Sequence, residues 1–136
     1  MAARSKARKR ALDILFESEA RDVAASLVLE ERVRAGDPPI HEYTAALVRG
    51  VAENAPRIDE LISAYAQGWS LERMPAVDRN VLRIGVYEIL YVEDVPDAVA
   101  VSEALNLVRE LSTDESPNFV NGVLGNILRN KPALTV

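Results

Sequence analysis

The chain has 136 residues, of which 49% are hydrophobic and 27% are charged, and it contains no cysteine. This composition is typical of one globular domain spanning residues 1–136, and it excludes disulfides, thiolate metal sites and a cysteine nucleophile. The one histidine, His41, is expected on the surface or at a helix cap, and it leaves little room for histidine catalysis or a metal. No apolar run is long enough to span a membrane and no secretory signal is evident, so we expect a cytoplasmic protein with no membrane partner.

The net charge of −5 is divided unevenly along the chain. Residues 1–10 carry five basic side chains and no acidic one, whereas the remaining chain holds 11 basic and 21 acidic residues, a balance of −10. The basic side chains of this N-terminal arm are Arg4, Lys6, Arg8, Lys9 and Arg10. Such an arm often binds nucleic acid, but the same pattern also fits a solvated helix start that aids solubility.

The first part of the chain predicts three helices, because apolar residues recur at helical spacing within residues 5–20, 22–35 and 40–54. Asp22 is expected to cap the start of the second helix. Gly36 and the two prolines that follow shortly after it are expected to end that helix.

The remaining chain predicts four further helices, within residues 56–67, 76–92, 97–111 and 117–130. The second of these is the most apolar and should be the most buried. Ser116 is expected to cap the last helix, and Trp69 is expected to pack the connector that follows Gly68 together with Leu71 and Met74. No strand pattern competes, so the sequence predicts an all-α fold of about seven helices in two small helical bundles that share one central helix.

The residues that could carry chemistry favour binding over catalysis. No Glu-x-x-His pair, glycine-rich phosphate loop or converging set of reactive groups is evident, so we expect neither an enzyme nor a cofactor. The adjacent acids Asp114 and Glu115 are better explained as favourable charge at a helix N-terminus than as an acid–base pair. Phe119 could be a core residue or stack on an RNA base, and Asn118 could be a surface residue or contact a base edge.

Four stretches of the sequence resemble the NusB family of bacterial transcription antitermination factors. They lie in order at residues 4–16, 75–89, 94–104 and 119–124. The last stretch, Phe-Val-Asn-Gly-Val-Leu, is the most specific, and the Trp69 connector looks like that of actinobacterial members. The resemblance implies a stand-alone, non-catalytic factor with seven helices in two bundles.

The resemblance also implies a function and partners. NusB-like proteins pair with NusE, a ribosomal protein of the small subunit, and bind boxA, a short single-stranded RNA in the leaders of ribosomal RNA operons. The complex joins elongating RNA polymerase with other Nus factors and suppresses termination. Some relatives form homodimers, so a second copy is a further candidate partner. The alternative is a helical protein–protein scaffold without specific RNA binding.

Site residues follow from the matching positions. The resemblance implies RNA contacts by Arg4, Lys6, Arg8, Lys9, Arg10, Glu115, Asn118 and Phe119. It implies NusE contacts by Phe16, Glu72 and Asp78. Of the arm residues, Arg8 is expected to reach RNA more freely than Arg10. Asp78 and Phe119 are both expected to be at least partly exposed, with helix capping as the alternative role of both Glu72 and Asp78.

Overall fold

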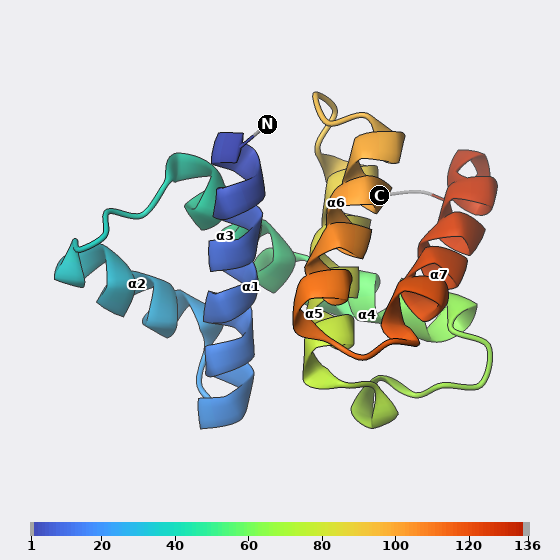
Figure 1. Ribbon diagram of the computed structural model, residues 1–136, viewed down its shortest axis with the longest axis horizontal. Coiled ribbons are helices and arrows are strands. Elements are labelled where there is room, and N and C mark those ends of the chain that lie inside the picture. Colours follow the sequence, from blue (N-terminus) through green and yellow to red (C-terminus); the bar gives the residue numbers. More distant parts are fainter. Residues whose placement is uncertain (1, 135–136) are drawn as a thin grey trace. The chain divides into compact units, whose positions relative to one another are not determined.

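The computed structural model describes residues 2–134, and the chain folds as one helix after another (Figure 1). The α-helices are α1 (Ala2–Arg21), α2 (Ala25–Ala35), α3 (Glu42–Glu53), α4 (Ala55–Tyr65), α5 (Ala76–Tyr91), α6 (Asp97–Leu111) and α7 (Ser116–Asn130). Two short 3-10 helices accompany them, η1 (Leu71–Arg73) after α4 and η2 (Lys131–Ala133) after α7. No strand occurs among the described residues, and the predicted all-α fold is confirmed.

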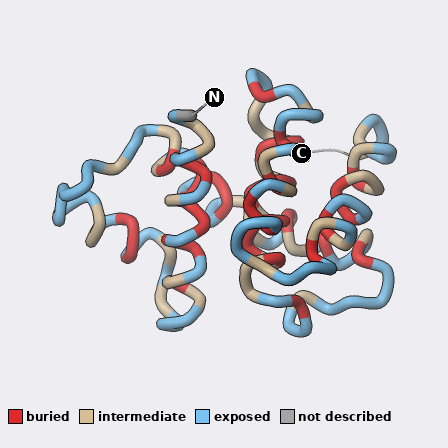
Figure 2. Tube along the Cα trace, in the orientation of Figure 1, coloured by how far each residue is buried: buried red, intermediate tan, exposed pale blue. Residues whose placement is uncertain are grey.

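The helices group into two compact units. Helices α1 to α3 form the first unit, which ends at Asn54, and helices α4 to α7 form the second unit, which begins at Ala55. Each unit has buried residues along its helices (Figure 2). This division confirms the prediction of two small helical bundles. The expectation that they share one central helix is wrong, because each described helix belongs to one unit.

In the first unit, α1 packs against both α2 and α3, and these two helices also contact one another. Helix α1 buries Ala7, Ala11 and Ile14, and α3 buries Leu47. The small alanine side chains let α3 approach α1 closely, and the Thr44 hydroxyl of α3 donates a hydrogen bond of 2.9 Å to the Ala7 carbonyl oxygen. The bond satisfies a buried hydroxyl that would otherwise be costly.

The helix ends of the first unit differ from the prediction at one place. Asp22 does not cap α2, because α1 runs up to the preceding residue and Asp22 leaves it with a left-handed φ of 55°. Helix α2 instead starts after Ala24, which makes no side-chain cap. Gly36 ends α2 with a φ of 66°, as expected. The cap at His41 is also confirmed, since its Nδ1 accepts a hydrogen bond of 2.9 Å from the Tyr43 N–H.

In the second unit, α5 contacts α4, α6 and α7. More than half of its residues are buried, which confirms that it is the most buried helix. Gly85 brings α5 and α7 close together, because a Cβ atom there would lie 3.2 Å from a methyl carbon of Leu124. Helix α4 is tied to α5 by Arg83, which donates to both carboxylate oxygens of Asp59 at 2.8 and 3.1 Å.

The connector between α4 and α5 fixes the position of Trp69. Gly68 follows α4 with a φ of 91°, a conformation that glycine adopts without strain. Farther along, the Arg79 guanidinium of α5 donates to the main-chain oxygens of Leu71 and Met74 at 2.7 and 2.9 Å. The part of the connector that leads into α5 is thereby held against the first turns of that helix.

Candidate functional site

The basic residues of the N-terminal arm lie on the first turns of α1, and the helix presents them in different directions. Lys6 and Lys9 are exposed, and Arg4 and Arg10 are half-buried. Arg8 is only 2% exposed, so it is the most enclosed cation of the arm. The expectation that Arg8 would reach RNA more freely than Arg10 is therefore wrong.

A tyrosine of α3 explains part of this difference. The guanidinium carbons of Arg4 and Arg8 lie 4.2 and 5.6 Å from the centroid of the Tyr43 ring. An arginine over an aromatic face gains stability, and it gains more where water is excluded. The contact comes from a different helix, so the local pattern of the arm contains no sign of it. Arg8 therefore acts first as a structural residue of the first unit.

Ion pairs connect α1 to α2 on the surface of the same unit. Arg21 pairs with Glu17 and Glu31, each at 2.7 Å, and Arg32 pairs with Glu17 as well. The hydrogen bonds from Arg32 and Arg21 lower the pKa of Glu17, and that from Arg21 lowers the pKa of Glu31. Both carboxylates are thus held in their charged form.

The three residues predicted to face a protein partner have different surroundings. Phe16 of α1 is 42% exposed, which is unusual for a large apolar side chain and suits a docking residue. Glu72 on η1 is also exposed. Asp78, in contrast, is 2% exposed, so the prediction that it is partly exposed is wrong.

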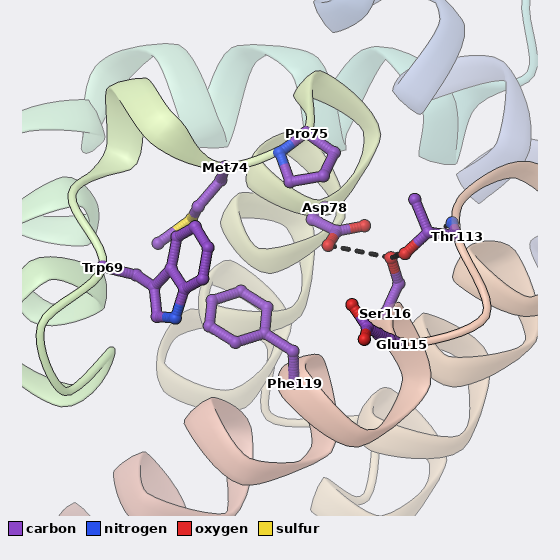
Figure 3. A pocket seen from close by; sticks show the side chains of 8 residues that line it. All are labelled: Trp69, Met74, Pro75, Asp78, Thr113, Glu115, Ser116 and Phe119. Carbon is purple, nitrogen blue, oxygen red and sulfur yellow. Dashed lines mark hydrogen bonds between the residues drawn. The ribbon is translucent and has the colours of Figure 1, made fainter.

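Asp78 holds the turn between α6 and α7 instead (Figure 3). Its two carboxylate oxygens accept hydrogen bonds from the hydroxyls of Ser112 at 2.6 Å and Ser116 at 2.9 Å. The Thr113 main-chain N–H in turn donates to the Ser116 hydroxyl oxygen at 3.2 Å. Ser116 is accordingly the first residue of α7 rather than its cap, which corrects the prediction for this residue. Asp78 lies in the first turn of α5, so this network fastens the start of α7 to the start of α5.

Two aromatic rings meet where this turn enters α7. The Trp69 and Phe119 rings have centroids 6.1 Å apart and planes inclined at 64°, and we call this pair the aromatic corner (Figure 3). Phe119 is half-buried, which confirms its expected partial exposure. Trp69 is 53% exposed, so the expectation that it packs the connector is wrong. Met74 fills that role, at 3% exposure.

The aromatic corner is shared by two hollows with different chemistry. The first, about 340 Å³, is also lined by the carboxylates of Asp78 and Glu115. The second, about 270 Å³, is lined by uncharged residues, Asn118 among them. Glu115 and Asn118 are both exposed. Glu115 therefore lies on the first hollow, Asn118 on the second and Phe119 on both. Trp69, which was expected to pack the connector, also lines both hollows.

The described part of the chain offers no metal site and no membrane helix. Among the described residues, no three histidine or carboxylate side chains are grouped as a metal ion would require. No described helix is long and apolar enough to cross a membrane. The described surface carries aromatic rings, amides and charged groups, and these side chains are suited to binding other molecules.

Comparison with known proteins identifies the family. The sequence model of the NusB family matches residues 5–129. The chain belongs to the NusB family. The predicted resemblance is thus confirmed, and with it the expectation of a transcription antitermination factor that is not an enzyme.

Curated NusB proteins from actinobacteria match over nearly their whole length. The transcription antitermination protein NusB of Nocardioides sp. (strain JS614) is 65% identical, over 98% of this chain and 99% of that protein. The NusB protein of Beutenbergia cavernae is 58% identical, over 98% of this chain and 94% of that protein.

Solved structures show the same fold. NusB from T. maritima is 38% identical with a TM-score of 0.83, covering 93% of this chain and 90% of that one. A chain in a complex of the antitermination factors NusB and NusE with double-stranded RNA is 26% identical with a TM-score of 0.83, covering 95% of this chain and 98% of that one.

Proposed function

We propose that this NusB-family protein binds single-stranded boxA RNA in the leaders of ribosomal RNA operons together with NusE. The observation that carries the proposal is the grouping of Glu115, Asn118 and Phe119 at the start of α7. A half-exposed ring beside an exposed amide offers a base both a stacking surface and hydrogen bonds. The turn that presents them is held by Asp78, so the site exists before RNA arrives.

The basic arm supplies the second part of RNA binding. Lys6, Lys9 and Arg10 contact phosphates, and binding gains free energy from the counterions they release. Arg4 and Arg8 lie against Tyr43 and keep this end of α1 in place. A structure of NusB and NusE with double-stranded RNA, one of the similar chains, supports NusE and RNA as the partners.

NusE binds through exposed residues of the acidic body. Phe16 supplies an apolar anchor, and Glu72 meets a basic group of the ribosomal protein. Beyond residue 10 the chain has a balance of −10, which attracts a basic protein and leaves the RNA to the arm. Asp78 contributes from inside, by fixing the turn rather than by touching NusE.

The assembled complex joins elongating RNA polymerase and other Nus factors in the cytoplasm and suppresses termination. Without its partners, the protein covers the same surfaces by forming a homodimer. Sedimentation of the free chain and of the chain with NusE checks this last point, since NusE should convert a dimer into a heterodimer.

Electrophoretic mobility shift tests the RNA claim. The protein with NusE is titrated against a boxA RNA and against a scrambled RNA of the same composition. We expect a shift of the boxA RNA at protein concentrations that leave the scrambled RNA free. Equal binding of both RNAs would instead support the alternative, a helical protein scaffold with no RNA specificity.

A further inference from the structure

The aromatic corner borders a hollow that combines two residues predicted to contact RNA, Asn118 and Phe119, with others that were not. This second hollow lies between the end of α4 and the first turns of α7, and it has a volume of about 270 Å³. Trp69 and Phe119 line it together with three carboxamide side chains, Gln67, Asn118 and Asn126. Every described residue that lines it is uncharged.

The chemistry of this hollow fits a nucleobase. Aromatic rings stack on bases of any sequence, and a carboxamide offers a donor and an acceptor side by side, which is what a base edge requires. Asn126 is held in place, because its amide oxygen accepts a hydrogen bond from Arg129. The neighbouring acidic hollow shares the two rings but has no carboxamide among its lining residues, and its carboxylates, Asp78 and Glu115, repel phosphates.

A glycine within α7 supplies an independent observation. Gly122 lines the hollow in the middle of a helix, where glycine is a poor helix former. A Cβ atom at Gly122 would meet no described atom within 4 Å, whereas a Cβ atom at Gly85 would press on Leu124 at 3.2 Å. Packing within the fold therefore explains Gly85 and does not explain Gly122. The missing side chain at Gly122 leaves the floor of the hollow open.

The geometry points to this hollow as the binding site for one unpaired nucleobase of the bound RNA, with Trp69 as its stacking surface and Gly122 as its floor. The inference rests on the proposed function and extends it to residues outside the predicted set. The base enters beside Phe119, and Gln67, Asn118 and Asn126 contact its edge.

Fluorescence of Trp69, the single tryptophan of the chain, reports on the site directly. The full chain with NusE is titrated with a boxA oligoribonucleotide, and then with a series in which each nucleotide in turn is abasic. The Trp69→Phe chain provides the background emission. We expect the intact RNA to change the Trp69 emission, and one abasic position to lose both that change and about 5- to 150-fold in affinity.

A pair of leucine variants separates this hollow from the acidic one. Gly122→Leu fills the hollow from its floor and favours the helix, so the fold should persist. Asn121→Leu adds the same side chain at the adjacent exposed position, which lines neither hollow. We expect Gly122→Leu to weaken RNA binding about 5- to 150-fold and to abolish the emission change, while Asn121→Leu binds like the original chain.

Two results would overturn the inference while the proposed function stands. One is boxA binding that leaves the Trp69 emission unchanged at every abasic position and that tolerates Gly122→Leu. The other is an emission change caused by NusE alone and lost in Gly122→Leu, which would assign the hollow to the protein partner. If the original chain with NusE does not bind boxA RNA at all, the proposed function itself fails.

Discussion

Arg8 and Phe119 show how the surroundings of a residue decide whether it contributes to stability or to binding. Both lie among residues assigned to RNA, but Arg8 is 2% exposed beside Tyr43, whereas Phe119 is half-buried at the rim of two hollows. An enclosed arginine is costly to truncate because truncation removes its packing and its charge interactions together. Truncation of a half-buried ring at the rim of a hollow mainly reduces the affinity for a ligand, and it costs less stability. The two residues should therefore respond to alanine in opposite ways.

Truncation of Phe119 tests its stacking role. We expect Phe119→Ala to weaken boxA binding by about 1–3 kcal/mol, the usual value of stacking one base on an aromatic ring. Its effect on stability should stay below the roughly 3–5 kcal/mol of a fully buried phenylalanine, because the ring is only half-buried. RNA titration and thermal unfolding of the same sample measure both. Leu27→Ala, which removes an exposed apolar side chain that has no assigned role in binding, is the control. A collapse of the melting temperature with RNA affinity unchanged would mean that Phe119 is a core residue.

Burial also divides the basic residues of the arm into those that stabilise the fold and those that contact RNA. We expect Arg8→Ala to lower the free energy of unfolding by about 1–2 kcal/mol, because the guanidinium no longer lies against the Tyr43 ring. Replacing Lys6 and Arg10 by alanine should leave stability nearly unchanged and flatten the logarithmic salt dependence of RNA binding by roughly 0.7 for each phosphate that is no longer neutralised. Denaturant unfolding and RNA titration over a range of salt concentrations provide the two readouts. An unchanged salt slope in the double variant would remove the arm from the RNA site.

At the scale of elements, helix ends are joined by buried or charged side chains that lie far apart in the sequence. Asp78 reaches 34 and 38 residues along the chain to Ser112 and Ser116, and it connects the start of α5 to the start of α7. Arg21 and Arg32 join α1 to α2 at the surface. The first connection is shielded from water and the second is not, so they should differ in strength and in salt dependence.

Removal of the Asp78 carboxylate should loosen the whole turn. Asp78→Ala takes away two charge-assisted hydrogen bonds, and we expect the free energy of unfolding to fall by about 3 kcal/mol. RNA affinity should fall as well, since the turn presents Glu115 and Phe119. Glu72→Ala, at an exposed position of the same unit, should change stability by less than about 0.5 kcal/mol. An Asp78→Ala chain that unfolds like the original would show that the hydroxyl network does not hold the turn.

The surface ion pairs predict how acid acts on the first unit. The pKa values of Glu17 and Glu31 are lowered in the folded chain, so these groups stabilise it above the unfolded glutamate pKa of about 4.3. That contribution is lost as the pH falls through the lower folded values. We expect Glu17→Gln to melt at a lower temperature than the original chain at pH 7, with the difference shrinking by pH 3. A constant difference across this range would contradict the assignment.

At the scale of the whole molecule, the sequence predicts the fold better than it predicts the surroundings of the site residues. Helical spacing and the positions of glycine and proline are local properties, and they predict the seven helices and the end of α2 at Gly36. The end of α4 was expected at Gly68, but this helix ends earlier, at Tyr65. The burial of Arg8 and Asp78 depends on partners in other helices, which no local pattern reveals. Trp69 and Met74 are both expected to pack the connector, but only Met74 is buried, and no local pattern distinguishes the two.

The division of charge also acts at this scale. The chain carries a basic arm and a remaining body with a balance of −10, which favour RNA and a basic protein respectively, so we expect both partners to bind at once. Binding of either partner alone would not distinguish an antitermination factor from a scaffold. An effect of the protein and its partners together on a transcribing RNA polymerase would distinguish the two.

The most direct test is single-round transcription through a terminator placed downstream of boxA, with RNA polymerase, NusE and the other Nus factors present. We expect the original chain to raise readthrough on the boxA template and not on a template with a scrambled element. Phe119→Ala should lose most of this effect at the same protein concentration. Equal readthrough on the two templates, or readthrough unchanged by adding the protein, would contradict boxA-dependent antitermination.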